Sequence, residues 1–385
     1  MNEQSARPAF VGVAVSHASD PVAAADDAAA AIDISETCFI LAFIPDHLVS
    51  PEFAEALEAR LGGVPIFGCT TAGQISGRGY ETDALVLLAF PKRHFRCASM
   101  LVTPLQPLSI KTIAADARRH SEKFLRTHGW NRLALLMVDG LAKQEDVLVS
   151  TLETVLGDIP VFGGSAADGL SFSQTFVLHG GQFHTDAALL LILETDLAFT
   201  GLGFDHFLPS DQQLVVTEAL PEDRLVLEIN GAPAAPEYAR LIGREVDALT
   251  PEVFAENPLL VRQNMAYHVR AIHAVQESDA LSFLSAIDDG LLMTLGRGKE
   301  ILETLEAGLS VTGPEGERPD FILGFDCVLR RLEIEQKGLK DAVSDIFRRH
   351  RVLGFNTYGE QHCGVHVNQT FVGVAFFGPG RKLLP

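Results

Sequence analysis

The densest group of polar side chains in the sequence lies between two apolar runs near the C-terminus, in residues 354–370 (GFNTYGEQHCGVHVNQT). Side chains that could bind a ligand or a metal follow one another there: Tyr358, Glu360, His362, Cys363, His366 and Asn368. One interpretation is a metal site made by the two histidines and the cysteine, since imidazole and thiolate are zinc ligands. A second is a hydrogen-bonding floor for a small ligand. A third is a turn whose glutamate and asparagine bond to backbone amides.

A second candidate is the loop of residues 68–73 (GCTTAG), which offers a thiol and two hydroxyls. Cys69, Thr70 and Thr71, together with backbone N–H groups, could bind a small anion. A nucleophilic Cys69 would need a base or cation beside it, and none is adjacent in the sequence. An enzyme that uses Cys69 or Cys363 is therefore the least supported class of function. The alternative for this loop is a compact structural turn, because a related loop has Gly164 in place of Cys69.

A third candidate is the stretch of residues 265–275, whose alternation predicts a strand with His268 and His273 on opposite sides. Either histidine could give a neutral imidazole to haem iron. Arg270 interrupts the otherwise apolar strand, and a buried guanidinium requires a carboxylate or phosphate-like partner. Glu360, or the acid group of a ligand, could be that partner.

An internal repeat positions these candidates. Residues 57–73 are echoed by residues 152–168 at a constant offset of 95, and residues 352–360 (VLGFNTYGE) echo residues 66–74 (IFGCTTAGQ) more weakly. Each copy is predicted to form a strand, a helix, a strand, a glycine-bearing loop and a further strand. Ligands usually bind beyond the carboxyl ends of strands in open α/β sheets. The three loops are therefore the first candidates for a site.

The pattern predicts an α/β fold of repeated β-α-β-turn-β units, in which mixed sheets pack together with helices outside. We predict two domains, residues 1–220 and 221–385, because apolar pattern and turn chemistry change together at residues 220–223. The first domain holds two repeats, residues 10–94 and 95–194.

Composition narrows the classes of function. The chain has 385 residues, of which 30 are basic and 50 acidic, and the net charge of −20 argues against a nucleic-acid or anionic-membrane surface. The basic clusters at residues 330–331 and 348–351 could contact anions, but we predict that they lie on solvated helix faces. The first apolar run, residues 10–15, is too short for a signal peptide or a membrane span, so we expect a cytoplasmic protein. Five scattered cysteines favour reduced thiols over disulfides.

Four motifs, taken in order, resemble the FIST sensory domain in its N- and C-terminal parts. They are the GCTTAG loop at residues 68–73, FGGSAADG at 162–169, EINGAPA with a following tyrosine at 228–238, and GFNTYGE with HVNQT at 354–370. The resemblance spans about residues 10–377. It implies an intracellular ligand-sensing module rather than an enzyme. With no kinase or receiver segment in the sequence, the chain is similar to stand-alone members, which include NosP-type haem proteins that sense nitric oxide.

The resemblance to that group implies a non-covalent b-type haem, a response to nitric oxide, and a separate histidine kinase or cyclic-nucleotide enzyme as partner. Covalent haem is not expected, because the sequence has no C-x-x-C-H motif. The candidate haem ligands are His268, His273, His362 and His366. The alternative is a sensor of a small carboxylate or amino acid, held by Arg270, the loop 68–73 and residues 358–368. Sheet edges would permit a homodimer.

Overall fold

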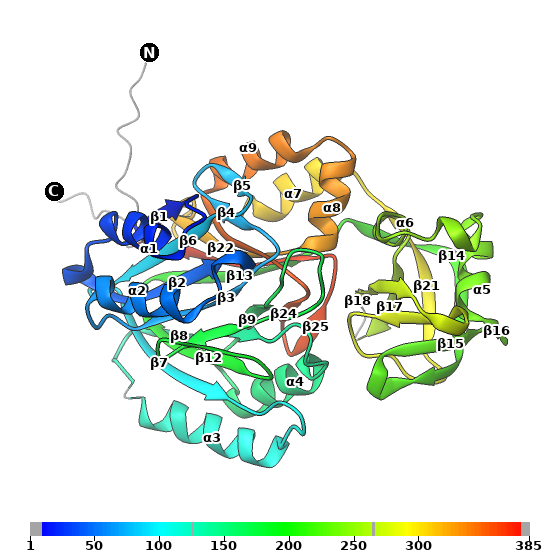
Figure 1. Ribbon diagram of the computed structural model, residues 1–385, viewed down its shortest axis with the longest axis horizontal. Coiled ribbons are helices and arrows are strands. Elements are labelled where there is room, and N and C mark those ends of the chain that lie inside the picture. The colour runs from blue at the N-terminus through cyan, green and yellow to red at the C-terminus, as the bar shows by residue number, and fades with distance from the viewer. Residues whose placement is uncertain (1–9, 125, 264–265, 379–385) are drawn as a thin grey trace.

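The computed structural model describes residues 10–124, 126–263 and 266–378. Within these residues, three six-stranded mixed sheets surround a common core, and an eight-stranded antiparallel sheet stands beside them (Figure 1). The α/β fold predicted from the sequence is confirmed. No helix in the described part of the chain is long and apolar enough to cross a membrane.

Each six-stranded sheet is built around one copy of the repeat. The first copy comprises β1 (Gly12–Ser16), α1 (Pro21–Ala30), β2 (Thr37–Ile44), α2 (Pro51–Leu61), β3 (Ile66–Thr70), β4 (Gln74–Ser76), β5 (Gly79–Glu81) and β6 (Leu85–Pro91). The second comprises β7 (Phe95–Val102), α3 (Ile110–Lys123), β8 (Asn131–Val138), α4 (Glu145–Leu156), β9 (Val161–Ser165), β10 (Val177–His179), β11 (Gln182–His184) and β12 (Ala188–Thr195).

The weak third echo in the sequence is a complete third copy. It comprises β13 (Ala198–Phe204), α7 (Ile301–Leu309), β22 (Phe321–Cys327), α8 (Val328–Gln336), α9 (Lys340–His350), β23 (Val352–Thr357), β24 (Glu360–His362), β25 (Val365–Val367) and β26 (Phe371–Phe377). In every copy the strands before and after the second helical segment are parallel neighbours, β2 with β3, β8 with β9 and β22 with β23.

The copies exchange their hairpins in a circle. The β4–β5 hairpin of the first copy pairs with β23, the β10–β11 hairpin of the second pairs with β3, and the β24–β25 hairpin of the third pairs with β9. Each sheet therefore contains strands from two copies, and strand pairing ties all three copies together.

One glycine in each copy allows the parallel strands to approach. A Cβ on Gly68, Gly163 or Gly354 would lie 2.0, 1.9 or 1.8 Å from a carbonyl oxygen of the neighbouring strand. No side chain fits at such a distance, so the glycine that marks the repeat in the sequence is required by backbone packing.

The inward faces of the three sheets share one apolar core, to which Phe43, Leu135 and Phe325 belong. Helices cover the outer faces: α1 and α2 on the first sheet, α3 and α4 on the second, α7 and α9 on the third. The helix α2 begins at Pro51, and Ser50 before it caps the helix by accepting a hydrogen bond from the Phe53 amide.

Residues 205–300 form an insert between β13 and α7, with a core of its own (Figure 1). It comprises β14 (Phe207–Leu220), β15 (Leu225–Ile229), β16 (Ala232–Pro233), α5 (Ala234–Ile242), α6 (Pro251–Glu256), β17 (Leu259–Gln263), β18 (Ala266–Arg270), β19 (Ile272–Val275), β20 (Leu281–Phe283) and β21 (Leu292–Gly298). Residue 220, where the sequence predicts a domain boundary, is the last residue of β14 and lies inside this insert, where β14 pairs with β15.

Two local predictions were wrong. The single strand predicted for residues 265–275 is two strands that part at Ala271, where β18 pairs with β17 and β19 with β20; residue 265 lies outside the described residues. Arg330 and Arg331 are buried, with 0% and 6% exposure, instead of solvated. The reason is that α8 lies between α6 of the insert and β22, and Arg330 pairs with Asp326 at 2.8 Å.

Candidate functional site

The three repeated loops meet. Backbone hydrogen bonds connect them in a ring: Ala72 N to Asn356 O, Tyr358 N to Ser165 O, and Ala167 N to Thr70 O. The carboxyl ends of the parallel pairs β2–β3, β8–β9 and β22–β23 therefore converge at one place.

The side chains of the loop of residues 68–73 help to hold this ring of loops together. Cys69 and Thr70 are fully buried and Thr71 is 3% exposed. Thr70 accepts a hydrogen bond from the Phe176 amide, and Thr71 accepts one from the Gln74 side chain. Burial raises the pKa of the Cys69 thiol, which keeps it protonated. In this structure these three side chains contact protein and present no surface to a ligand.

Glu360 is the counterpart of Gln74 in the first copy. Its carboxyl group accepts hydrogen bonds from the hydroxyls of Thr357 and Thr370 and from the Thr370 amide. Burial raises its pKa to about 8, although these hydrogen bonds oppose the rise. Gln74 makes the equivalent contacts with Thr71 and the Ala84 amide. Glu360 thus bonds to its own loop and not to Arg270.

Tyr358 belongs to a polar and aromatic group that sequence reasoning found only in part. Its hydroxyl donates to Asp168, whose carboxylate also accepts the amides of Phe172, Ser173 and Gln174. Burial opposes ionisation of Asp168, but these hydrogen bonds outweigh it and lower the pKa. They also hold Phe172 at a φ of 49°, an unusual conformation for an aromatic residue, with its ring stacked on Tyr358 at 4.2 Å.

Arg270 lies at the end of β18, where the insert meets the third copy. It is 8% exposed, and burial lowers the pKa of its guanidinium despite the nearby Asp146. Its Nη1 donates to the His366 carbonyl at 3.4 Å, and its Nε is buried without a partner. No carboxylate in the described residues lies within ion-pair distance of it.

Three buried polar side chains of the third copy are connected to this arginine, and with it they form what we call the Arg270 cluster. They are His366, whose carbonyl accepts its hydrogen bond, Gln361, which contacts the His366 ring at 3.3 Å, and Asn368. The isolated bridge between Val269 and Asn368 brings them next to β18. Gln361 Oε1, His366 Nε2 and Asn368 Oδ1 are buried with no hydrogen-bond partner. Buried polar atoms are normally paired, so these unpaired atoms make the cluster a candidate functional site. Gln361 was not a candidate in the sequence, where nothing distinguishes it from its neighbours.

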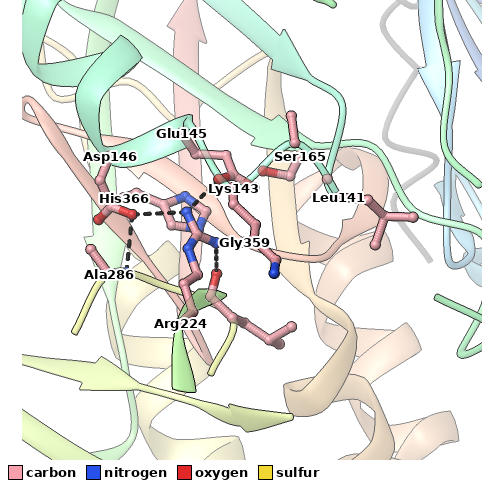
Figure 2. Close-up of polar contacts among 12 residues, drawn as sticks. Leu141, Lys143, Glu145, Asp146, Ser165, Arg224, Ala286, Gly359 and His366 are labelled. Carbon is pink, nitrogen blue, oxygen red and sulfur yellow. Dashed lines mark hydrogen bonds and ion pairs between the residues drawn. The ribbon is translucent and has the colours of Figure 1, made fainter. Parts of the chain in front are cut away.

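A second arginine of the insert reaches the same place. Arg224 is 5% exposed and bonds to Glu145 at 2.6 Å and Asp146 at 3.1 Å, both at the start of α4. Asp146 also accepts the Ala286 amide at 3.1 Å. Figure 2 shows Arg224 in contact with these carboxylates, whose charges, like that of Arg224, act on the nearby His366. Arg224 thus holds the insert against α4. The sequence did not identify Arg224 as a candidate, because its partners are far away in the chain.

The four candidate histidines do not meet at one point, although His268 and His362 are close enough for their charges to interact. His366 and Gln361 face each other across the β24–β25 hairpin, whereas His362 alternates to the other face and stacks on Phe162 at 5.6 Å. His273 lies against Phe172, with ring centroids 4.2 Å apart and the ring planes tilted by 51°. Burial lowers the pKa of all four imidazoles, including His268, and so favours their neutral form. Among the described residues no three His, Cys, Asp or Glu side chains are placed to hold a metal ion.

Comparison with known proteins agrees with this architecture. Residues 38–232 match the FIST N domain and residues 234–363 match the FIST C domain. The chain is also similar to the uncharacterized protein MJ1623 of Methanocaldococcus jannaschii, with 24% identity over 210 residues, or 53% of this chain. It spans 40% of the length of that relative. The two domain matches show that the chain belongs to the FIST family of sensory and signalling domains.

Proposed function

We propose that this protein senses a small metabolite that carries a carboxylate, an organic acid or an amino acid, and binds it at Arg270. The observation that carries the proposal is a guanidinium with 8% exposure and no carboxylate partner in the described residues. Burying an unpaired charge is costly, and a carboxylate is the group whose geometry matches the guanidinium fork.

The surrounding cluster supports the same ligand class. The unpartnered atoms of Gln361, His366 and Asn368 include acceptors that an ammonium or hydroxyl group could satisfy. Arg270 belongs to the insert, whereas the other three side chains belong to the third copy. A ligand held by both would stabilise their contact, which is a direct way to convert binding into a change in the protein.

Thermal unfolding with a panel of carboxylates and amino acids tests the proposal. A ligand at a hundredfold excess over its Kd should stabilise the protein by about 2.7 kcal/mol. The stabilisation should disappear in Arg270→Met and persist in Arg297→Met, an exposed arginine of the same insert. If every acid leaves the melting temperature unchanged, or if Arg270→Met responds like the unmodified chain, the proposal is wrong.

Haem with nitric-oxide sensing is a second candidate, favoured by one observation: His366 Nε2 lacks a partner and burial keeps the ring neutral. The fit is poor. A Cβ on Gly359 would lie 2.6 Å from this Nε2, so the backbone covers the nitrogen, and Arg224, Arg270 and Asp146 make the surroundings charged. A b-type haem needs an apolar slot. The residues around His366 therefore do not fit a haem.

An absorption titration decides between the two candidates. A Soret band that saturates at one haem per chain, moves with nitric oxide and is lost in His366→Ala would overturn the preference for a carboxylate. We further propose, from the resemblance to stand-alone FIST proteins, that a separate histidine kinase or cyclic-nucleotide enzyme reads the bound state. Its activity, measured with and without the stabilising ligand, tests this.

A further inference from the structure

Two cysteines from different copies of the repeat lie where the first sheet faces the second. Cys38 is near the start of β2, and Cys97 is in β7, an edge strand of the second sheet. Strands β2 and β7 contact each other although they belong to different sheets. Beside the cysteines, the rings of Phe39 and Phe95 pack edge to face with their centroids 6.4 Å apart. The two cysteines therefore occupy an interface between the first and second copies.

The two thiols share one cavity. It has a volume of about 450 Å³, and Cys38, Cys97, Ser99 and His179 are among the residues that line it. The backbone amide of Cys97 donates a hydrogen bond to the Cys38 sulfur, and the charge of Cys38 acts on the Cys97 thiol. Because the amide and the thiol of Cys97 belong to one residue, the two sulfurs are near enough for rotation about χ1 to bring them together.

Access to solvent distinguishes these two cysteines from the buried ones. Both are partly exposed, so a small solute in the cavity can reach their sulfurs. Cys69 and Cys327 are fully buried, with 0% exposure, and the exposed Cys363 lies on the turn between β24 and β25. Cys38 and Cys97 are therefore both accessible and adjacent, which the formation of a disulfide requires.

We propose that Cys38 and Cys97 are a redox pair that hydrogen peroxide oxidises to a disulfide, which locks the first copy of the repeat to the second. One thiol attacks the O–O bond of the peroxide, which gives a sulfenic acid and releases one water. The other thiol attacks the sulfenic sulfur, so that the S–S bond forms and a second water leaves. In total the two thiols lose two electrons and two protons, and the peroxide is reduced to two waters.

Cys38 is the thiol that reacts first. Burial raises the pKa of both thiols, but Arg96, Lys92 and the Cys97 amide oppose the rise at Cys38. At Cys97 the nearby Cys38 raises the pKa further. The thiolate is the nucleophile, so Cys38 attacks the peroxide and Cys97 resolves the sulfenic acid. Because the pKa values of both thiols are raised, oxidation should be slow near neutral pH and faster as the pH rises.

Thiol counting and peptide mapping test the proposal. The parent chain carries Cys363→Ser, which removes the exposed thiol and leaves four of the five cysteines. It is treated with hydrogen peroxide at about pH 8.5, the ordinary pKa of a free cysteine, then denatured and labelled with a maleimide. We expect the number of labelled thiols to fall from four to two and to recover after reduction with dithiothreitol. Mass spectrometry of a digest should find the peptides of Cys38 and Cys97 joined, with the loss of two hydrogen atoms.

Single replacements in this parent chain give the controls. Cys38→Ser should form no disulfide, and Cys97→Ser should instead accumulate a sulfenic acid at Cys38 that dimedone traps. Arg270→Met should lose the same two thiols as the parent, because the pair is separate from the proposed ligand site. The peptide map of the parent decides the matter even if a variant does not fold. The proposal is overturned if peroxide leaves all four thiols free, if Cys38→Ser loses as many thiols as the parent, or if the map joins other cysteines.

Discussion

Replacing Glu360 by glutamine should make the protein more stable, and increasingly so as the pH rises. The first copy of the repeat already has glutamine here, where Gln74 bonds to Thr71 and accepts the Ala84 amide. Glu360 makes matching contacts while fully buried, and burial raises its pKa to about 8 from the ordinary value of 4.5. A neutral amide would keep the contacts without the cost of burying a charge.

The magnitude follows from proton linkage. Between pH 4.5 and about pH 8 the folded chain keeps a proton on Glu360 that the unfolded chain has released, so the free energy of unfolding falls as the pH rises. Each pH unit of this window corresponds to about 1.4 kcal/mol. The contribution of Glu360 to the free energy of unfolding is therefore fully favourable below pH 4.5. Between about pH 5 and pH 8, roughly 3 kcal/mol of this contribution is lost.

Urea denaturation of the unmodified chain and Glu360→Gln across this pH range measures the difference. We expect similar stabilities near pH 5 and an advantage of roughly 3 kcal/mol for the variant near pH 8. The converse change, Gln74→Glu, should introduce a new loss of stability with rising pH. A difference between Glu360→Gln and the unmodified chain that stays constant within about 0.5 kcal/mol from pH 5 to pH 8 would refute the reasoning.

Two further substitutions test how the copies and the insert are held together. Arg224→Met should cost about 3 kcal/mol or more in urea denaturation, since it leaves Glu145 buried at 1% exposure without its partner. Adding Glu145→Gln should recover part of the loss, and a cost below about 1 kcal/mol would contradict a buried pair. Gly163→Ala should lower the free energy of unfolding by about 3 kcal/mol, because its Cβ would lie 1.9 Å from a carbonyl oxygen. Gly298→Ala, with nothing within 4 Å, is the matched control, and equal melting temperatures for the two variants would disprove the packing argument.

The repeat was visible in the sequence because one local constraint recurs in every copy. Gly68, Gly163 and Gly354 each face a backbone oxygen, so no other residue fits at those positions. Arg270 was also recognisable, because a charged side chain inside an apolar strand conflicts with its surroundings. Arg330 was misjudged for the opposite reason: a basic residue on a helix is usually solvated, and its burial depends on an insert distant in sequence.

The sequence by itself determined the strand–helix–strand units and the glycine loops, and it identified Arg270 as a candidate binding residue. These features depend on residues near one another in the chain. The tertiary structure alone decided which sheet each hairpin joins, because strands of three residues such as β10 and β24 encode too little to select a partner. It also decided that Arg224 meets Glu145, 79 residues away, that Arg270 donates to the His366 carbonyl, and that Gln361 contacts the His366 ring. Such contacts arise from packing between segments that are distant in the chain, so they cannot be recognised from the local sequence.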